Sequence, residues 1–286
     1  MTHIITITWA RNEEDILEAF VRHNAPYIDR MIIVLHRSID SSQDILLKLI
    51  QEGYPLEIAE NNTYAHRQSA ALTTLMHEIS HRKNPDWILP LDADEFLIAP
   101  SRISFEQALS TLPPDTGALL PWRTYIPTVN DPSHQKTILR SIGHRRKEEI
   151  AQFYKICIPR YIAQNSDTVI PLGSHTLLNK THEELVPTMQ LSSVQLGHFP
   201  VRTEQQLRQK VINGWDSHCA NPNRNPGEIF QWEMLYERCR DPAPISPEEL
   251  QEIALWYAIP KDRRNTVNEI VYDPVPDVCL QSAKHV

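Results

Sequence analysis

The sequence is poor in glycine and cysteine, and it lacks a long hydrophobic run. Only seven glycines occur in 286 residues, and neither a GxGxxG fingerprint nor a P-loop is present, which argues against a dinucleotide-binding domain or a Walker-type NTPase. No apolar run reaches the roughly 18 residues of a membrane-spanning helix. The few cysteines are far apart and form no CxxC pair, a pattern typical of reduced thiols rather than a disulfide framework or a zinc knuckle; they are Cys157, Cys219, Cys239 and Cys279.

Basic residues are outnumbered by acidic residues. The net charge is -8, with 22% charged and 41% hydrophobic residues, which describes an ordinary globular protein. An acidic balance argues against nucleic acid as the main partner, because phosphate binding favours a basic surface. Residues 1–7 enter a β-rich run without the basic and then apolar shape of a signal peptide. We therefore expect a cytoplasmic protein.

Three carboxylates follow an apolar run in residues 87–97 (WILPLDADEFL). Asp92, Asp94 and Glu95 stand at the predicted end of a strand, and hydrophobic residues resume at once. Burying carboxylates is costly unless cations or hydrogen-bond donors compensate them. Oxygen ligands of this kind favour Mg²⁺ or Mn²⁺ over zinc, and ligands bind at the carboxyl ends of strands in open α/β sheets. The segment therefore predicts a cation site, with a solvated acidic loop as the alternative.

Strand-like runs and helical periods alternate over the first 122 residues. Asn12 is expected to cap a first helix. Strands separated by helices predict an α/β fold with a mainly parallel sheet flanked by helices. The predicted strands cover residues 3–9, 31–35, 56–59, 87–91 and 117–122, and further helices cover residues 43–52, 66–81 and 105–112.

The remainder of the chain has a different texture, with more proline and fewer long periodic segments. Short strand-like runs lie at residues 153–158 and 190–196. Helices are predicted at residues 203–216, 228–238 and 246–257, the last with Ser246 as its cap and Glu249 three residues later. We expect a helical C-terminal region.

Four segments carry recognisable motifs. They are residues 9–15 (WARNEED), 34–42 (VLHRSIDSS), 86–96 (DWILPLDADEF) and 197–202 (GHFPVR), the last ahead of a basic helix with Lys210. Together they resemble family 2 glycosyltransferases of the GT-A fold, in particular the bacterial branch with a DADEF motif. Departures occur in the second segment, where Leu35 replaces the family's aspartate and Arg37 and Ser41 replace its turn glycines, so one expected nucleotide contact is missing.

The resemblance implies a Rossmann-like GT-A fold and a metal-dependent inverting glycosyltransferase that uses a nucleotide-diphospho-sugar donor. The divalent cation, Mn²⁺ or Mg²⁺, would bind Asp94 and His198. Donor contacts are expected from residues in the matching loops: Asn12, Glu13, Asp40, Asp92 and Arg202. Arg202 and Lys210 are cations suited to a diphosphate, although Lys210 fits a solvated helix position equally well.

The resemblance also implies a pathway and a division of labour along the chain. The acceptor would be a glycan or glycolipid in cell-surface polysaccharide synthesis. Residues 1–122 would hold the donor, residues 123–260 the acceptor, and residues 261–286 would form a tail. Peripheral contact with the inner face of the membrane stays open as an alternative, although no basic amphipathic stretch favours it.

Transfer to a hydroxyl needs a general base within hydrogen-bond reach. Glu228 is our candidate, because a Pro-Gly turn presents it at a predicted helix start beside aromatic residues. A helix also favours a first-turn carboxylate for purely structural reasons. Asp216 and Glu95 are the other candidates.

Two other classes of function compete with this interpretation. Residues 77–81 (HEISH) match HExxH, the helical motif in which His77 and His81 would bind zinc in a metalloprotease and Glu78 would act as base. The third ligand of the longer metzincin pattern is absent. A non-catalytic glycan- or nucleotide-binding module on the same fold is the second competitor, which the Leu35 departure favours.

Overall fold

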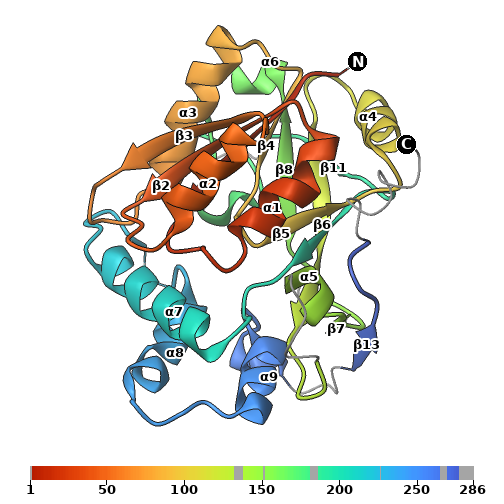
Figure 1. The fold of residues 1–286 in the computed structure, drawn as a ribbon. Helices are drawn as coiled ribbons and strands as arrows, with labels where there is room; N and C mark the ends of the chain where they lie inside the picture. Colours follow the sequence, from red (N-terminus) through yellow and green to blue (C-terminus); the bar gives the residue numbers. More distant parts are fainter. Residues whose placement is uncertain are drawn as a thin grey trace.

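Four parallel strands form the centre of the fold (Figure 1). β1 (Ile4–Ala10) lies between β2 (Arg30–His36) and β4 (Trp87–Pro90), and β3 (Leu56–Asn61) pairs with the far side of β2. Every residue of β1 is buried, as expected for a strand covered on both faces. The arrangement comes from a computed structural model that describes residues 2–131, 138–150, 152–180, 186–225, 227–264 and 269–276.

Helices cover both faces of these strands. α1 (Leu17–Asn24) and α2 (Ser42–Gln51) pack on one face, where Phe20 and Leu46 join a large hydrophobic cluster. α3 (Gln68–Arg82) packs on the other face through Leu72 and Met76. The predicted fold class is therefore confirmed: an α/β fold in which a mainly parallel N-terminal sheet is flanked by helices.

Antiparallel strands extend the sheet beyond β4. β8 (Tyr154–Pro159) pairs with β4, β6 (Gly117–Ile126) pairs with β8, and β7 (His144–Arg146) pairs with β6. β5 (Glu95–Ile98) and β12 (Gln195–His198) form an antiparallel pair, and β12 runs parallel to β6. β6 crosses residue 122, and the predicted division of labour at that residue stays a prediction.

Three helices form the C-terminal layer, seen at the bottom of Figure 1. They are α7 (Glu204–Cys219), α8 (Phe230–Arg240) and α9 (Pro247–Trp256), and they enclose a third cluster that includes Val211 and Tyr257. The hydroxyl of Ser246 accepts a hydrogen bond from the backbone N–H of Glu249, so the predicted cap of α9 is confirmed.

A late segment closes the edge of the sheet. β13 (Ile270–Tyr272) pairs antiparallel with β7. Immediately after it, the backbone carbonyl of Asp273 accepts a hydrogen bond from the hydroxyl of Tyr125 at 2.7 Å. Val275 packs so closely against Gly197 of β12 that a Cβ there would lie 2.9 Å from its Cγ2. Residues 269–276 therefore cover β6 and β12 from the outside.

The remaining elements are short, apart from α4, which begins at the cap Ser101. They are α4 (Arg102–Ser110), α5 (Ile138–Ser141), α6 (Arg160–Ala163), η1 (Ala25–Tyr27), η2 (Leu172–Ser174), η3 (Lys261–Arg263), β9 (Thr168–Val169), β10 (Leu178–Asn179) and β11 (Thr188–Gln190).

Two local predictions differ from the structure. Asn12 does not cap α1, because its side chain instead accepts a hydrogen bond from the backbone N–H of Ile39. Residues 190–196 are not one strand: β11 ends at Gln190, residues 191–194 are irregular, and β12 begins at Gln195. Cys279 lies outside the described residues. Within the described ranges, no helix has the length and apolar character needed to cross a membrane.

Candidate functional site

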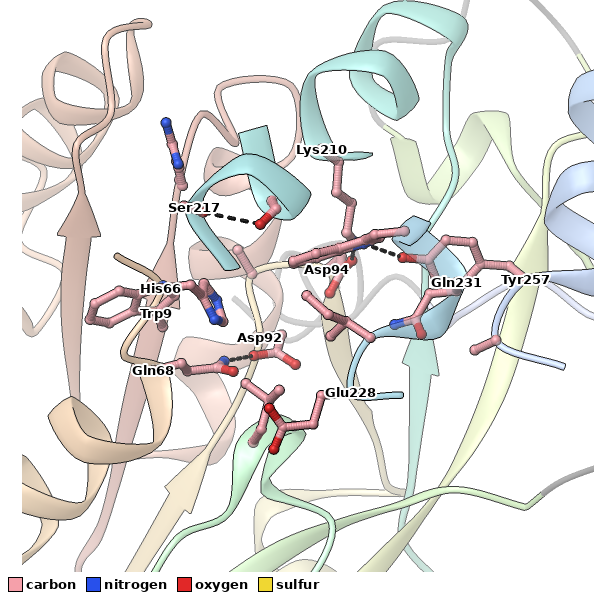
Figure 2. A pocket seen from close by; sticks show the side chains of 18 of the residues that line it. Trp9, His66, Gln68, Asp92, Asp94, Lys210, Ser217, Glu228, Gln231 and Tyr257 are labelled. Atoms are coloured by element: carbon pink, nitrogen blue, oxygen red, sulfur yellow. Dashed lines mark hydrogen bonds and ion pairs between the residues drawn. The ribbon is translucent and has the colours of Figure 1, made fainter. Parts of the chain in front are cut away.

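A cavity of about 440 Å³ lies where the carboxyl ends of the central strands face the C-terminal helices (Figure 2). Strand ends supply Trp9, His36 and the Asp92–Asp94 turn, and the C-terminal helices supply Lys210 and Trp232. This is the position at which open α/β sheets bind ligands. Lining residues therefore come from segments more than a hundred residues apart in the chain.

The acidic turn after β4 is held by its own third carboxylate. A side-chain oxygen of Glu95 accepts a hydrogen bond from the backbone N–H of Asp92 at 2.9 Å, and the N–H of Glu95 bonds back to the carbonyl of Asp92 at 3.0 Å. Glu95 is fully buried, and burial raises its pKa although a lysine lies opposite. Closing the turn in this way turns Asp92 and Asp94 toward the cavity, which both residues line.

Asp92 is paired with a buried lysine. Nζ of Lys155, on β8, lies 2.6 Å from Oδ2 of Asp92 and 3.2 Å from Oε1 of Glu95. Lys155 also donates to the carbonyl of Gly173 at 3.0 Å, and Gln68 donates to Oδ1 of Asp92 at 3.0 Å. Burial alone would lower the pKa of Lys155, but the two carboxylates outweigh it and raise the pKa.

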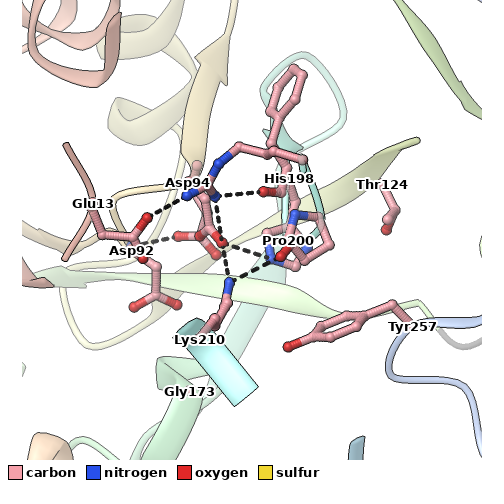
Figure 3. A network of polar contacts seen from close by, with 12 residues as sticks. Glu13, Asp92, Asp94, Thr124, Gly173, His198, Pro200, Lys210 and Tyr257 are labelled. Carbon is pink, nitrogen blue, oxygen red and sulfur yellow. Dashed lines mark hydrogen bonds and ion pairs between the residues drawn. The ribbon is translucent and has the colours of Figure 1, made fainter. Parts of the chain in front are cut away.

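Asp94 is surrounded by nitrogen atoms (Figure 3). Its Oδ2 accepts a hydrogen bond from Nζ of Lys210 at 2.5 Å, and His198 Nε2 and Arg202 Nη1 each lie 3.9 Å from the same oxygen. Burial would raise the pKa of Asp94, but the charge of Lys210 outweighs it and holds the pKa below its usual value. Asp94 is therefore an anion whose nearest cation is Lys210.

Arg202 is engaged by carboxylates of the first loop rather than by the cavity. Its guanidinium donates to Glu13 at 2.6 Å and to both oxygens of Asp15 at 2.7 and 2.9 Å. It is buried, and burial would lower its pKa, but Glu13 and Asp15 together raise it. Arg202 thus fixes Glu13 at the cavity wall. Its predicted contact with the donor stays a prediction.

His198 lies on the cavity wall against Trp122. The two rings stack with centroids 4.0 Å apart, and burial lowers the pKa of His198 to about 3. Nδ1 of His198 has no hydrogen-bond partner among the described residues. His198 is therefore a neutral imidazole that Trp122 orients beside Asp94.

Asn12 and Asp40 hold the first two loops together. The N–H of Asn12 donates to the hydroxyl of Ser38 at 3.2 Å, and Asp40 accepts from the N–H of Glu14 at 3.0 Å. Both belong to loops beside the cavity, whereas the cavity wall at this point is formed by Glu13 and His36. Their predicted contact with a nucleotide stays a prediction.

Of the three candidate bases, Glu228 lines the cavity. Its carboxylate accepts hydrogen bonds from the N–H and the side-chain amide of Asn225 at 3.1 and 2.7 Å. Ile229, the next residue, has a left-handed backbone with φ of 49°, which is strained for a β-branched side chain. Asp216 instead accepts a hydrogen bond from the hydroxyl of Tyr236 at 2.5 Å, and Glu95 is buried beneath the turn.

The carboxylates, as placed, do not fit a divalent cation. Oδ2 of Asp92 and Oδ2 of Asp94 each hold a lysine ammonium at hydrogen-bond distance. Nε2 of His198 lies 3.9 Å and Nζ of Lys210 lies 2.5 Å from Oδ2 of Asp94, so an ion bound to that oxygen would lie beside the ammonium group. Among the residues that the structure describes, no three His, Cys, Asp or Glu side chains are grouped to hold a metal ion, so an ion here would depend on waters and phosphate oxygens for most of its ligands.

The HExxH motif is a structural part of α3. Both ring nitrogens of His77 lie 3.0 Å from backbone carbonyls, those of Ala163 and Thr168. Glu78 forms an ion pair with Arg82 at 2.5 Å. His77 therefore anchors α3 to the neighbouring loop, and the zinc-protease interpretation does not hold.

Sequence reasoning missed Lys155 and Gln68, the two partners of Asp92. The signal for Lys155 was present, because a single lysine interrupts the apolar strand YKICIP. A charge in such a run needs an opposite charge nearby, and the acidic turn was the natural candidate. Gln68 has no comparable signal, since its contact depends on how α3 is set against β4.

No family model matches the chain, and no curated protein matches it in sequence. Solved structures match it at low identity. S. aureus TarS 1–349 is 11% identical over 84% of this chain and 72% of that chain, with a TM-score of 0.43. The mannosyltransferase PcManGT from Pyrobaculum calidifontis, in complex with GDP-Man and Mn²⁺, is 12% identical over 88% and 72%, with a TM-score of 0.43. Glucosyl-3-phosphoglycerate synthase from Mycobacterium tuberculosis, in complex with Mn²⁺, UDP and glucosyl-3-phosphoglycerate, is 15% identical over 78% and 81%, with a TM-score of 0.41. These likenesses assign no activity to this chain.

Proposed function

We propose that the chain is a glycosyltransferase that moves a sugar from a nucleotide-diphospho-sugar to an acceptor hydroxyl. One observation carries the proposal: all four segments that resemble family 2 glycosyltransferases contribute to one cavity. Glu13, His36, Asp94 and His198 represent the four segments on its wall. Four segments that are far apart in the sequence are not expected to lie around one cavity unless they serve one site.

The proposed reaction is a single displacement. The bond between the anomeric carbon and the diphosphate oxygen breaks, and its electron pair stays on the leaving diphosphate. The acceptor oxygen bonds to the anomeric carbon and gives its proton to Glu228. This single displacement inverts the anomeric centre. Lys210 on the cavity wall would meet the negative charge that develops on the diphosphate.

The acceptor would enter beside the aromatic side of the cavity, which is formed by Trp122, Phe153, Trp232 and Tyr257. Aromatic side chains with polar tips offer both apolar contact and hydrogen bonds, which suits a glycan or the head of a glycolipid. The sequence resemblance also supports a role in the synthesis of cell-surface polysaccharide. Peripheral contact with the membrane stays open as an alternative. We leave the divalent cation out of the reaction because the carboxylates do not fit it.

Thermal unfolding in the presence of UDP, GDP, CDP or dTDP tests the donor site. A nucleotide at about 100 times its dissociation constant stabilises the folded state by about 2.7 kcal/mol. Turnover is then measured as release of that nucleotide from its diphospho-sugar. A chain that no nucleotide stabilises would contradict the proposal.

Glu228→Gln tests the proposed base. Loss of a general base slows the chemical step by about 100-fold or more, while nucleotide binding is expected to persist. Glu237→Gln is the matched control, because Glu237 is an exposed carboxylate on α8. Glu228→Gln with normal turnover would remove Glu228 from the mechanism, and wild-type protein that binds a nucleotide without transferring sugar would identify a binding module.

A further inference from the structure

Each aspartate of the acidic turn already has its own cation. Lys155 neutralises Asp92 and Lys210 neutralises Asp94, at 2.6 and 2.5 Å. The lysines come from distant parts of the chain, β8 and α7, so two separate elements place an ammonium group on the same turn. A divalent cation on these carboxylates would meet two positive charges within hydrogen-bond distance of its ligands, which raises the cost of binding it.

Lys155 cannot easily make room. Its side chain is fully buried, and Nζ has three oxygen atoms around it, from Asp92, Glu95 and the carbonyl of Gly173. Moving the ammonium away would leave Glu95 and the Gly173 carbonyl without this partner in a buried place, which costs several kcal/mol. Lys155 therefore acts as a permanent counter-ion beneath Asp92.

Lys210 differs because it lines the cavity. Figure 2 shows its side chain reaching from α7 down to Asp94. Nζ also lies 3.4 Å from the carbonyl of Pro200 and 5.9 Å from the ring centroid of Tyr257. An ammonium group has three N–H donors, and Asp94 and Pro200 are its two acceptors among the described residues, so one donor is left for a ligand.

We propose that Lys210, held by Asp94 and backed by the Lys155–Asp92 pair, binds the diphosphate of the donor in place of a divalent metal ion. The inference rests on the proposed function and deepens it, because it makes donor binding independent of metal. Asp94 then acts as a positioning residue that keeps the ammonium group in the cavity. An ammonium is a point charge well suited to phosphate oxygens.

Calorimetric titration of wild-type protein tests the proposal without any variant. The probes are UDP, GDP, CDP, dTDP and inorganic pyrophosphate, each in excess EDTA and again with Mn²⁺. The nucleotide that binds should do so with dissociation constants that agree within about twofold in the two conditions. Affinity that appears only with Mn²⁺, or that rises about tenfold or more with it, would overturn the inference.

Lys210→Met identifies the group responsible. Removing a charge-assisted hydrogen bond should weaken nucleotide binding in EDTA about tenfold or more, whereas Lys210→Arg should retain a larger part of the affinity. Lys48→Met is the control, because Lys48 is an exposed lysine on α2. Equal affinity of Lys210→Met and wild type, with circular dichroism showing both folded, would overturn the role of Lys210.

Failure of this inference can be told apart from failure of the proposed function. Nucleotide binding with Mn²⁺ alone rejects the lysine but keeps the donor site. Absence of binding in both conditions rejects the two together. Binding in EDTA that Lys210→Met abolishes supports both.

Discussion

Among single residues, Lys155 has the most demanding environment. Its ammonium group is fully buried between Asp92 and Glu95, where a charge is tolerated only if it is paired. Of its two partners, Glu95 is fully buried, whereas the side chain of Asp92 is 29% exposed and lines the cavity. The acidic turn is therefore a balanced set of charges, and removing one member should be felt by the whole fold.

Lys155→Met should lower the free energy of unfolding by about 3–5 kcal/mol, because it leaves the fully buried Glu95 and the partly exposed Asp92 without the ammonium group that they share. Urea denaturation measures the loss. Adding Glu95→Gln to the same protein should recover part of the stability, since it removes the buried carboxyl group whose ionised form has lost its partner. Lys48→Met, on the exposed face of α2, should stay close to wild type. A loss in Lys155→Met no larger than in this control would show that the charges are not balanced as described.

His66 gives a prediction of pH dependence. Burial, and then the charges of His36 and other neighbours, lower its pKa to about 3, so the folded protein keeps it neutral. The unfolded chain takes up a proton below about pH 6.5. The contribution of His66 to stability is therefore complete above pH 6.5 and is lost as the pH falls toward the folded-state pKa.

The measurement compares wild type with His66→Gln. The difference in their free energies of unfolding should change by about 1.4 kcal/mol per pH unit between roughly pH 6 and pH 4. A difference is needed because burial raises the pKa values of Glu13 and Glu95, whose titration acts in the opposite direction in wild type alone. A constant difference across this range would mean that His66 titrates normally in the folded protein.

Among the elements, the strands of the N-terminal half were predictable and the contacts between distant elements were not. The apolar run before Asp92 predicted β4 and the acidic turn after it. Carboxylates directly after a buried strand lie at its carboxyl end, where open α/β sheets bind ligands. The split of residues 190–196 into β11 and β12 depends on pairing with β6 and β5, which local propensity does not encode. Likewise, asparagine is a common helix N-cap residue, but the side chain of Asn12 instead accepts a hydrogen bond from the backbone N–H of Ile39.

α7 and α8 approach each other through a glycine. A Cβ added at Gly214 would lie 2.5 Å from ring carbon Cζ3 of Trp232, whose indole N–H donates to the hydroxyl of Tyr257 at 2.9 Å. Gly214→Ala should therefore cost about 1–2 kcal/mol, as overpacking outweighs the better helix propensity of alanine. Urea denaturation should show a smaller cost in a Trp232→Phe background, where the clashing ring is absent. Equal costs in both backgrounds would mean that contact with the Trp232 ring is not the source of the cost.

In the molecule as a whole, the candidate site forms only when the N-terminal sheet and the C-terminal helices have packed together. The sheet brings the acidic turn, and the C-terminal layer brings Lys210 and Trp232. Sequence patterns located most of the lining segments because each resembles a known motif. The lone lysine in the apolar strand β8 indicated a buried ion pair, but the pairing of Lys210 with Asp94 had no such signal, since it depends on how α7 is set against the turn.

Hydrogen exchange offers a test at this level. A nucleotide diphosphate bound in the cavity should slow backbone exchange both in residues 91–95 and in the part of α7 around Lys210, because both sides contact it. α4, which contributes no residue to the cavity wall, should be unaffected and serves as the internal control. Protection of only one side would contradict a site shared by the sheet and the C-terminal helices.

The segment after β13 has a consequence for biosynthesis. Val275 packs against Gly197, and the carbonyl of Asp273 holds Tyr125, so β12, the strand that ends in His198, is covered by residues made some 75 positions later. A ribosome-bound chain that still holds residues 269–276 in the exit tunnel has its acidic turn but an uncovered β12. Assembly of the site during translation should therefore lag behind assembly of the N-terminal sheet, and chaperones would meet an exposed strand in the interval.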